Sequence, residues 1–155
     1  MIALVQRVLR ARVDVGERCV GAIERGLLVF VCAQPGDDEA VCRRLVDKLV
    51  ALRIFSDAQG KMNLNVRQVQ GSLLIVSQFT LAADLSGGHR PSFTGAAPPA
   101  LARRLYEHVL DRARAALEHV QSGEFGADMR VSLVNDGPVT VPITLSARAG
   151  ATDQR

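Results

Sequence analysis

Residues 73–81 read Leu73-Leu74-Ile75-Val76-Ser77-Gln78-Phe79-Thr80-Leu81. The run opens with consecutive β-favouring apolar residues and is too short for a typical helix, so it predicts a strand. Hydroxyl and amide side chains follow directly in the sequence. We expect residues 73–81 to form the central strand of the fold and to hold these polar groups rigidly at its end.

A second apolar run, residues 129–134, leads into Asn135-Asp136-Gly137-Pro138-Val139-Thr140. Taken alone, Asn135, Asp136 and Gly137 favour a hairpin turn between two strands. Pro138 adds a second interpretation, because a Gly-Pro bond has an increased chance of being cis and Gly137 permits backbone angles closed to larger residues. The pair can therefore form a rigid backbone wedge, although most X-Pro bonds in proteins are trans.

Other strands are predicted in the first half of the chain. Residues 12–15 alternate in polarity as a strand does, Gly16 marks a hairpin, and residues 26–31 form an apolar run typical of a buried strand. Residues 53–56 are expected to be extended, and residues 57–60 to form a turn.

Two helices are predicted between and after these strands. Asp37 or Asp38 can cap the first one, and its apolar stripe consists of Val41, Leu45, Leu49 and Leu52. The second helix begins at Pro98-Pro99 and runs to about Val120. Residues 82–99 are rich in Gly and Pro and predict a loop, and residues 121–128 are expected to turn the chain. Together the elements predict one α+β domain.

Length and charge narrow the function classes. The chain has 155 residues, enough for one domain, and a formal net charge of +3. Among its basic residues only Lys48 and Lys61 are lysines. This moderate charge is compatible with transient contact with a nucleic acid through a local patch, and it argues against a protein that coats nucleic acid without selection.

The cysteines give no sign of a disulfide framework or a metal site. Cys19, Cys32 and Cys42 are odd in number and lack metal-ligand spacing, which predicts reduced thiols. Residues 1–15 carry arginines within their apolar pattern, so they resemble neither a signal peptide nor a membrane span. We therefore expect a soluble, cytoplasmic protein without metal or cofactor.

The two polar segments also lack the parts of a conventional hydrolase. A nucleophilic Ser77 or Thr80 needs a positioned base, yet the histidines fall outside both segments, at His89, His108 and His119. An ester that is already activated and has a neighbouring hydroxyl on its alcohol part would make fewer demands on the protein. Orientation and oxyanion stabilisation by backbone amides could suffice for such a substrate.

Six segments in order carry a resemblance to a known family: Gln6-Arg7-Val8, Arg53-Ile54-Phe55-Ser56-Asp57, Gly60-Lys61-Met62-Asn63-Leu64-Asn65-Val66, Ser77 to Leu81, Arg90-Pro91-Ser92-Phe93 and Asn135 to Thr140. The series resembles the D-aminoacyl-tRNA deacylases, also called D-tyrosyl-tRNA deacylases. It runs from Met1 to about Thr140, which predicts a deacylase domain over residues 1–145. Residues 146–155 have no counterpart in the family pattern and are expected to form a flexible, dispensable tail.

The resemblance implies a small barrel-like sheet with packed helices in a symmetric homodimer. It also implies an enzyme that hydrolyses D-aminoacyl-tRNA, and glycyl-tRNA as well, with no cofactor and no DNA or membrane partner. Ser77, Gln78, Phe79 and Thr80 would line the adenosine and aminoacyl site. A cis Gly137-Pro138 pair would reach into the partner's pocket and exclude L-amino acids. Arg7 would brace that loop through hydrogen bonds to backbone carbonyls. Phe125 and Met129 would lie beside the pocket, although residues of either type are more often part of a core.

The sequence leaves alternatives open on mechanism and function. Thr80 can be read as a nucleophile, whereas we favour substrate-assisted chemistry in which the Phe79 amide stabilises charge and Thr80 positions substrate or water. A related editing domain acting on an L-aminoacyl-tRNA is a second enzyme hypothesis, against which the Gly137-Pro138 match argues. A noncatalytic tRNA-binding module is the third hypothesis.

Overall fold

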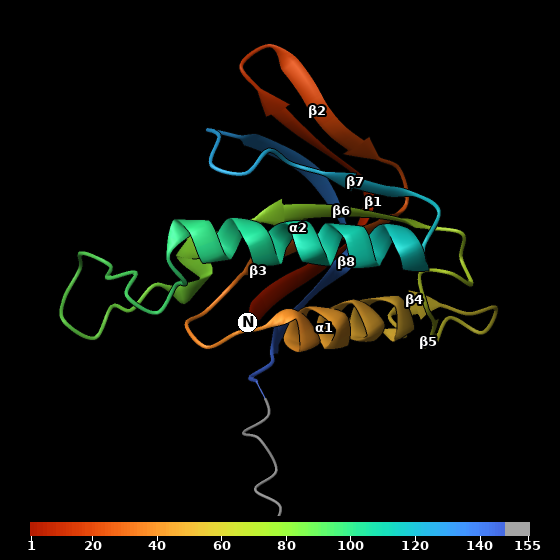
Figure 1. Cartoon of the computed structure of the whole chain (residues 1–155). Helices are drawn as coiled ribbons and strands as arrows, with labels where there is room; N and C mark the ends of the chain where they lie inside the picture. The colour runs from red at the N-terminus through yellow and green to blue at the C-terminus, as the bar shows by residue number, and fades with distance from the viewer. Residues whose placement is uncertain (148–155) are drawn as a thin grey trace, which may run out of the picture.

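The computed structural model describes residues 1–147, which form one small domain with a strongly curved sheet and two helices (Figure 1). The elements in chain order are β1 (Ile2–Val15), β2 (Arg18–Ile23), β3 (Gly26–Cys32), α1 (Glu39–Ala51), β4 (Phe55–Ser56), β5 (Met62–Leu64), β6 (Ser72–Ser77), the 3-10 helix η1 (Phe79–Ala82), α2 (Pro99–Ala116), β7 (Val120–Ser122) and β8 (Arg130–Thr144).

The main sheet is organised around the long strand β1. Its strands follow the order β2-β1-β3-β6-β7, and β8 pairs with β1 along its other edge. β1 runs antiparallel to both β2 and β3, whereas β6 runs parallel to both β3 and β7. The parallel pairing of β3 and β6 brings the ends of both strands, Val31 and Ser77, side by side.

The sheet curls until β2 approaches β7, which makes it barrel-like as predicted. Gly21 of β2 lies so close to β7 that a Cβ atom there would be 2.5 Å from the carbonyl oxygen of Ser122. Side chains that alternate along the strands fill the inside of the curve, among them Val8, Leu28, Leu74 and Val76. Glycine at position 21 therefore permits the near closure of the sheet.

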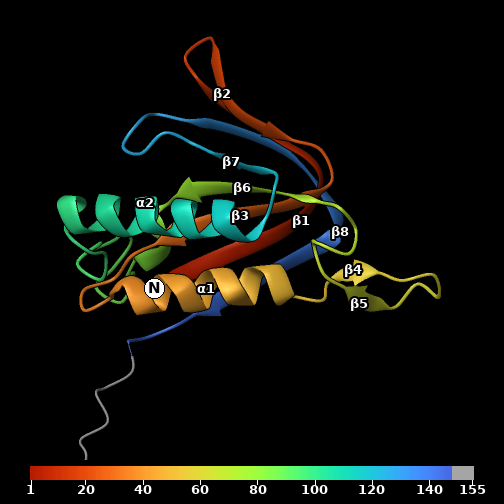
Figure 2. The same cartoon turned by 45° about the vertical axis from the view of Figure 1, so that its right-hand side comes forward.

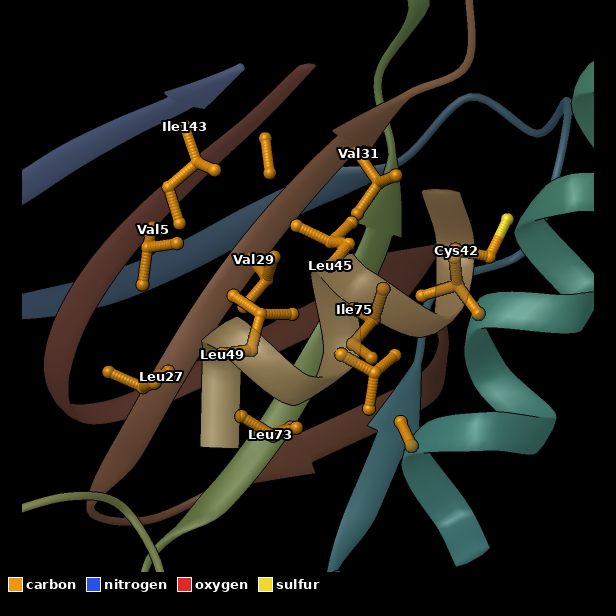
Figure 3. Packing of buried hydrophobic residues seen from close by; sticks show 14 of the residues in the cluster. Val5, Leu27, Val29, Val31, Cys42, Leu45, Leu49, Leu73, Ile75 and Ile143 are labelled. Carbon is orange, nitrogen blue, oxygen red and sulfur yellow. The ribbon is translucent and has the colours of Figure 1, made fainter. Parts of the chain in front are cut away.

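The opposite set of alternating side chains packs under the two helices, which lie side by side on the outer face of the sheet (Figure 2). Leu27, Val29 and Val31 of β3 and Leu73 and Ile75 of β6 meet the apolar stripe of α1 there (Figure 3). The predicted stripe residues Val41, Leu45 and Leu49 are each at most 1% exposed. The strand predicted at residues 26–31 is confirmed.

Asp38 and Asp37, the two alternatives for the helix cap, have different partners. Asp38 is the N-cap of α1, and its Oδ1 accepts a hydrogen bond from the amide of Val41 at 2.9 Å. Asp37 instead pairs with the α-amino group of Met1 at 2.7 Å, with both groups buried. The helix start and the first strand are thus fixed by adjacent carboxylates.

Three expectations about element boundaries were wrong. The strand that carries the first polar segment ends at Ser77 and not at residue 81, because its partner strand β3 ends at Cys32. The chain then turns into η1, where the Leu81 amide donates a hydrogen bond to the Gln78 carbonyl oxygen at 3.2 Å. The second helix ends at Ala116, since the Leu73 amide bonds the carbonyl of His119 and draws the following residues into β7. Residues 121–128 therefore include the end of a strand.

The expected hairpin turn at Asn135, Asp136 and Gly137 was also wrong. β8 continues through them as one strand, antiparallel to β1. The pairing shifts there, because Gln6 faces Thr140 while Val8 faces Asn135, so that residues 136–139 bulge out of the ladder. The chain keeps its direction, since the strand on both sides of the bulge finds the same partner.

The C-terminal segment is described only at its start. The carbonyl oxygen of Ser146 accepts a hydrogen bond from Arg44 at 2.8 Å. The rest of the predicted tail, residues 148–155, lies outside the described residues. Within residues 1–147 no helix is long and apolar enough to cross a membrane.

Candidate active site

A cavity of about 670 Å³ lies where the ends of β3 and β6 meet the start of α2. These elements come together at the left of Figure 1. The turn between β7 and β8 closes the far side with Phe125 and Met129, so both of these predicted residues line the cavity. The barrel end and the helix together make a hollow of the size typical for small-molecule sites.

The first polar segment forms one wall of this cavity. Ser77, Gln78 and Phe79 line it, whereas Thr80 is exposed and lies outside the lining. The Gln78 amide bonds the Val31 carbonyl oxygen at 2.8 Å, which holds the segment against β3. The Gln78 side-chain amide bonds the Thr80 hydroxyl. Three of the four predicted residues are therefore brought together at the cavity, with Thr80 attached to its edge.

The start of η1 leaves backbone donors unused. Within residues 1–147 the amides of Phe79 and Thr80 have no hydrogen-bond acceptor, as expected for the first residues of a helix. The Phe79 side chain, 55% exposed, packs edge to face on Phe93 with ring centroids 5.1 Å apart. This contact fixes the backbone that presents the two free amides.

Tyr106 forms the floor between α2 and β6. Its hydroxyl donates a hydrogen bond to the carbonyl oxygen of Ile75 at 2.8 Å, and its ring lies 5.9 Å from that of Phe125. Burial raises the pKa of Tyr106 to about 12. Burial likewise raises the pKa of Cys32, another lining residue. Both side chains are therefore neutral at physiological pH.

The chemical character of the cavity follows from this lining. Among the described residues that line it there is no side chain of Asp, Glu, His, Lys or Arg. A conventional triad is thus missing from the cavity walls of the single chain. Within residues 1–147 no cluster of three or more His, Cys, Asp and Glu side chains could hold a metal ion.

The second polar segment lies apart from this cavity in the same chain. Gly137 and Pro138 are absent from its lining, and their peptide bond is cis. Gly137 has a φ of +145°, a conformation that L side chains rarely adopt. Asn135 closes the base of the bulge, because its Oδ1 accepts the Val139 amide at 2.7 Å and its Nδ2 donates to the Thr140 hydroxyl at 2.9 Å.

Arg7 holds the bulge from the side of β1. Its Nε donates to the Asp136 carbonyl oxygen at 2.8 Å, and its Nη1 donates to the Ile54 carbonyl oxygen at 2.7 Å. The residue is only 9% exposed. These are the carbonyl contacts expected of it, and they also tie the bulge to the residue before β4.

Sequence reasoning missed two aromatic residues of the site. Phe93 belongs to a segment quoted for the family resemblance, yet nothing in the pattern gave it a partner. Tyr106 is the only tyrosine of the chain and follows Leu105 on the apolar side of α2. A lone tyrosine on a buried helix face needs a hydrogen-bond partner, and that signal could have indicated its contact with the sheet.

Comparisons with known proteins show which family the chain is similar to. The family model described as D-Tyr-tRNA(Tyr) deacylase matches residues 4–144. A D-aminoacyl-tRNA deacylase of Aromatoleum aromaticum is 64% identical over 145 residues, covering 94% of this chain and 95% of that protein. One of Variovorax paradoxus is 60% identical over 146 residues, covering 94% of this chain and 100% of that protein.

Solved structures show the same fold. A structure named c-Myc DNA Unwinding Element Binding Protein has a TM-score of 0.89 and 38% identity, and covers 95% of this chain and 100% of that one. A probable eukaryotic D-amino acid tRNA deacylase has a TM-score of 0.80 at 16% identity, covering 92% of this chain and 97% of that one, which supports the fold alone. The predicted family and enzyme class, a deacylase acting on an ester bond, are confirmed. The chain belongs to the D-Tyr-tRNA(Tyr) deacylase family.

Proposed function

We propose that this protein hydrolyses the ester bond of D-aminoacyl-tRNA and releases the free D-amino acid and the tRNA. The observation that carries the proposal is the uncharged cavity bordered by Ser77, Gln78 and the free amide of Phe79. Family membership and relatives named as D-aminoacyl-tRNA deacylases support the substrate class. We further propose that this reaction removes wrongly charged tRNA before translation and that it takes place in the cytoplasm.

The chemistry proceeds by positioning and by stabilisation of the oxyanion. With no general base on the cavity wall, the 2′-hydroxyl of the terminal ribose beside the ester assists the attack of water. The Phe79 amide donates to the carbonyl oxygen as it gains negative charge. Thr80, held at the edge by Gln78, positions the substrate or the water.

Selection against L-amino acids uses the bulge at Gly137 and Pro138. Because this pair lies outside its own cavity, a second copy of the chain supplies it in a symmetric homodimer, which creates two equivalent sites. The bulge leaves room for hydrogen or a D-side chain and collides with an L-side chain, so glycyl-tRNA is also a substrate. Steric rejection needs no tailored contact to each accepted side chain.

Hydrolysis of D-tyrosyl-, L-tyrosyl- and glycyl-tRNA, measured side by side, tests the proposal. We expect turnover of the D-tyrosyl and glycyl esters and none of the L-tyrosyl ester. Turnover of the L-ester alone would identify an editing domain of the opposite chirality. Binding of tRNA without turnover of any ester would identify a noncatalytic RNA-binding module. That DNA is not a partner stays a prediction.

A further inference from the structure

Arg103 lies at the mouth of the cavity on α2. It follows the lining residue Ala102 and stands four residues after Pro99 and three before Tyr106, both of which also line the cavity. Residues at these spacings share one side of a helix. Arg103 therefore continues the cavity-facing side of α2 toward solvent.

The guanidinium group is held in place by an aromatic ring. Its central carbon lies 4.9 Å from the ring centroid of Phe125, which lines the cavity. Stacking of this kind restrains an arginine side chain and leaves the N–H groups at its rim available. The donor set is thus oriented before any ligand arrives, at the border between cavity and solvent.

The charge of Arg103 is hardly compensated. Its only ion pair within residues 1–147 joins Nη1 to Glu107 Oε1 at 3.9 Å, too long for a hydrogen bond. Both of these side chains are more than half exposed. Glu124, which precedes Phe125 in the chain, is engaged by Arg18 at 2.9 Å, and Asp128 of the same turn forms no ion pair with Arg103 within residues 1–147. A preoriented, uncompensated guanidinium beside an uncharged cavity is a site for an anion.

We propose that Arg103 binds the phosphate group on the 5′ side of the terminal nucleoside, as a positioning residue at the cavity mouth. The aminoacyl-nucleoside enters the uncharged cavity, and the first negative charge of the nucleic acid remains outside it. A planar guanidinium can hold two phosphate oxygens at once, which fixes the direction of the chain as well as its charge. This inference rests on the proposed function, because it assumes an aminoacylated nucleoside in the cavity.

The test compares two ligands that differ by one phosphate. Adenosine carrying a D-tyrosyl group in a stable 3′-amide linkage is prepared with and without a 5′-phosphate, and the Kd of each is measured by calorimetry. Wild-type protein should bind the phosphorylated ligand about tenfold more tightly, which corresponds to about 1.4 kcal/mol. Arg103→Gln should remove this preference and leave the Kd of the unphosphorylated ligand within about twofold.

Arg112→Gln is the matched control, because Arg112 lies on the same helix and pairs with Asp47 of α1. It should keep the wild-type preference, and Arg103→Lys should keep part of it. Equal weakening of both ligands by Arg103→Gln would show that Arg103 acts only by packing on Phe125 and would overturn the proposal. An unchanged preference in Arg103→Gln would also overturn it. Failure of the proposed function is a separate result, namely no turnover of the corresponding esters by wild-type protein that still binds the amides.

Discussion

The guanidinium group of Arg7 donates a hydrogen bond to the backbone carbonyl of Asp136 across 2.8 Å, although the residues are separated by 129 positions in the chain. The same side chain also bonds the Ile54 carbonyl at 2.7 Å. One buried arginine thus fixes the bulge of β8 relative to the segment that leads into β4. Its planar, multiple-donor geometry can satisfy both carbonyls, whereas a lysine has a single charged nitrogen.

Replacing Arg7 with lysine should loosen the bulge and relax chiral selection. We expect the ratio of kcat/KM for L-tyrosyl-tRNA to that for D-tyrosyl-tRNA to rise at least about tenfold, and the free energy of unfolding to fall by about 1 to 3 kcal/mol. Arg12→Lys serves as the control, because Arg12 lies on the same strand but is exposed and pairs with Asp14. A destabilised Arg7→Lys variant with unchanged L-rejection would contradict the bracing role.

The sequence predicted the elements whose apolar pattern repeats over many residues. β3, the start of β6 and the stripe of α1 at Val41, Leu45 and Leu49 follow directly from such periodicity. The end of α2 was missed because no Gly or Pro stops the apolar pattern after Ala116. The stop comes from long-range pairing of Leu73 with Val120, which no local pattern reveals.

The site was predictable only in part for the same reason. Ser77, Gln78 and Phe79 are neighbours in the chain, so one segment carried them to the cavity together. The turn propensity of Asn135 and Gly137 was overridden, because β1 pairs with β8 on both sides of the bulge and keeps the strand continuous. The lone Tyr106 on the apolar side of α2 signalled the need for a hydrogen-bond partner, but which carbonyl it would bond, like the Ile54 partner of Arg7, depends on contacts between distant elements.

Thr80→Ala should retain measurable deacylation. Thr80 lies outside the cavity lining, and its hydroxyl bonds only the Gln78 side chain among the hydrogen bonds of the described residues. We expect kcat/KM for D-tyrosyl-tRNA to fall by less than about tenfold, whereas loss of a sole nucleophile can cost about a millionfold. Mass spectrometry of quenched reactions provides the decisive readout, since an acyl group attached to Thr80 would overturn the substrate-assisted mechanism.

Removing the 2′-hydroxyl of the terminal ribose should have the larger effect. With D-tyrosine linked to the 3′-oxygen of a 2′-deoxy terminus, we expect kcat to fall at least about a hundredfold while KM changes little, because the neighbouring hydroxyl acts in the chemical step. Single-turnover measurements on the two tRNAs separate this step from binding. Equal rates on the two tRNAs would exclude substrate assistance and would indicate that a group of the protein activates the water or acts as the nucleophile.

Tyr106 should destabilise the fold at alkaline pH. Its pKa is raised from 10.0 to about 12 by burial, so the unfolded chain loses this proton at lower pH than the folded chain. The contribution is fully present below pH 10, and about 2 to 3 kcal/mol of unfolding free energy is lost as the pH rises from 10 to 12. Tyr106→Phe should flatten this part of the stability curve, as measured by urea unfolding. A parallel decline in both proteins would show that Tyr106 contributes nothing to it.

Gly137→Ala should displace the bulge, because a Cβ atom at Gly137 would lie 2.7 Å from Val139 Cγ2 and 2.9 Å from the Val139 amide nitrogen. The φ of +145° adds strain for any L side chain. We expect turnover of L-tyrosyl-tRNA to appear while turnover of D-tyrosyl-tRNA persists. Gly16→Ala is the control, since Gly16 also has a positive φ but nothing lies within 4 Å of an added Cβ.

Mixed dimers decide whether the bulge acts on its own cavity or on that of a second copy. One chain carries Ala102→Trp, which fills its cavity mouth, and the other carries Gly137→Ala, so the single open cavity belongs to the chain with the altered bulge. If the bulge acts in trans, this open cavity meets an intact Gly137 and rejects L-tyrosyl-tRNA. The dimer with both substitutions on one chain and none on the other should instead hydrolyse the L-ester, because the altered bulge then faces the open cavity. The reverse pattern would assign the bulge to its own chain, and a monomeric protein that still rejects L-esters would remove the need for a partner.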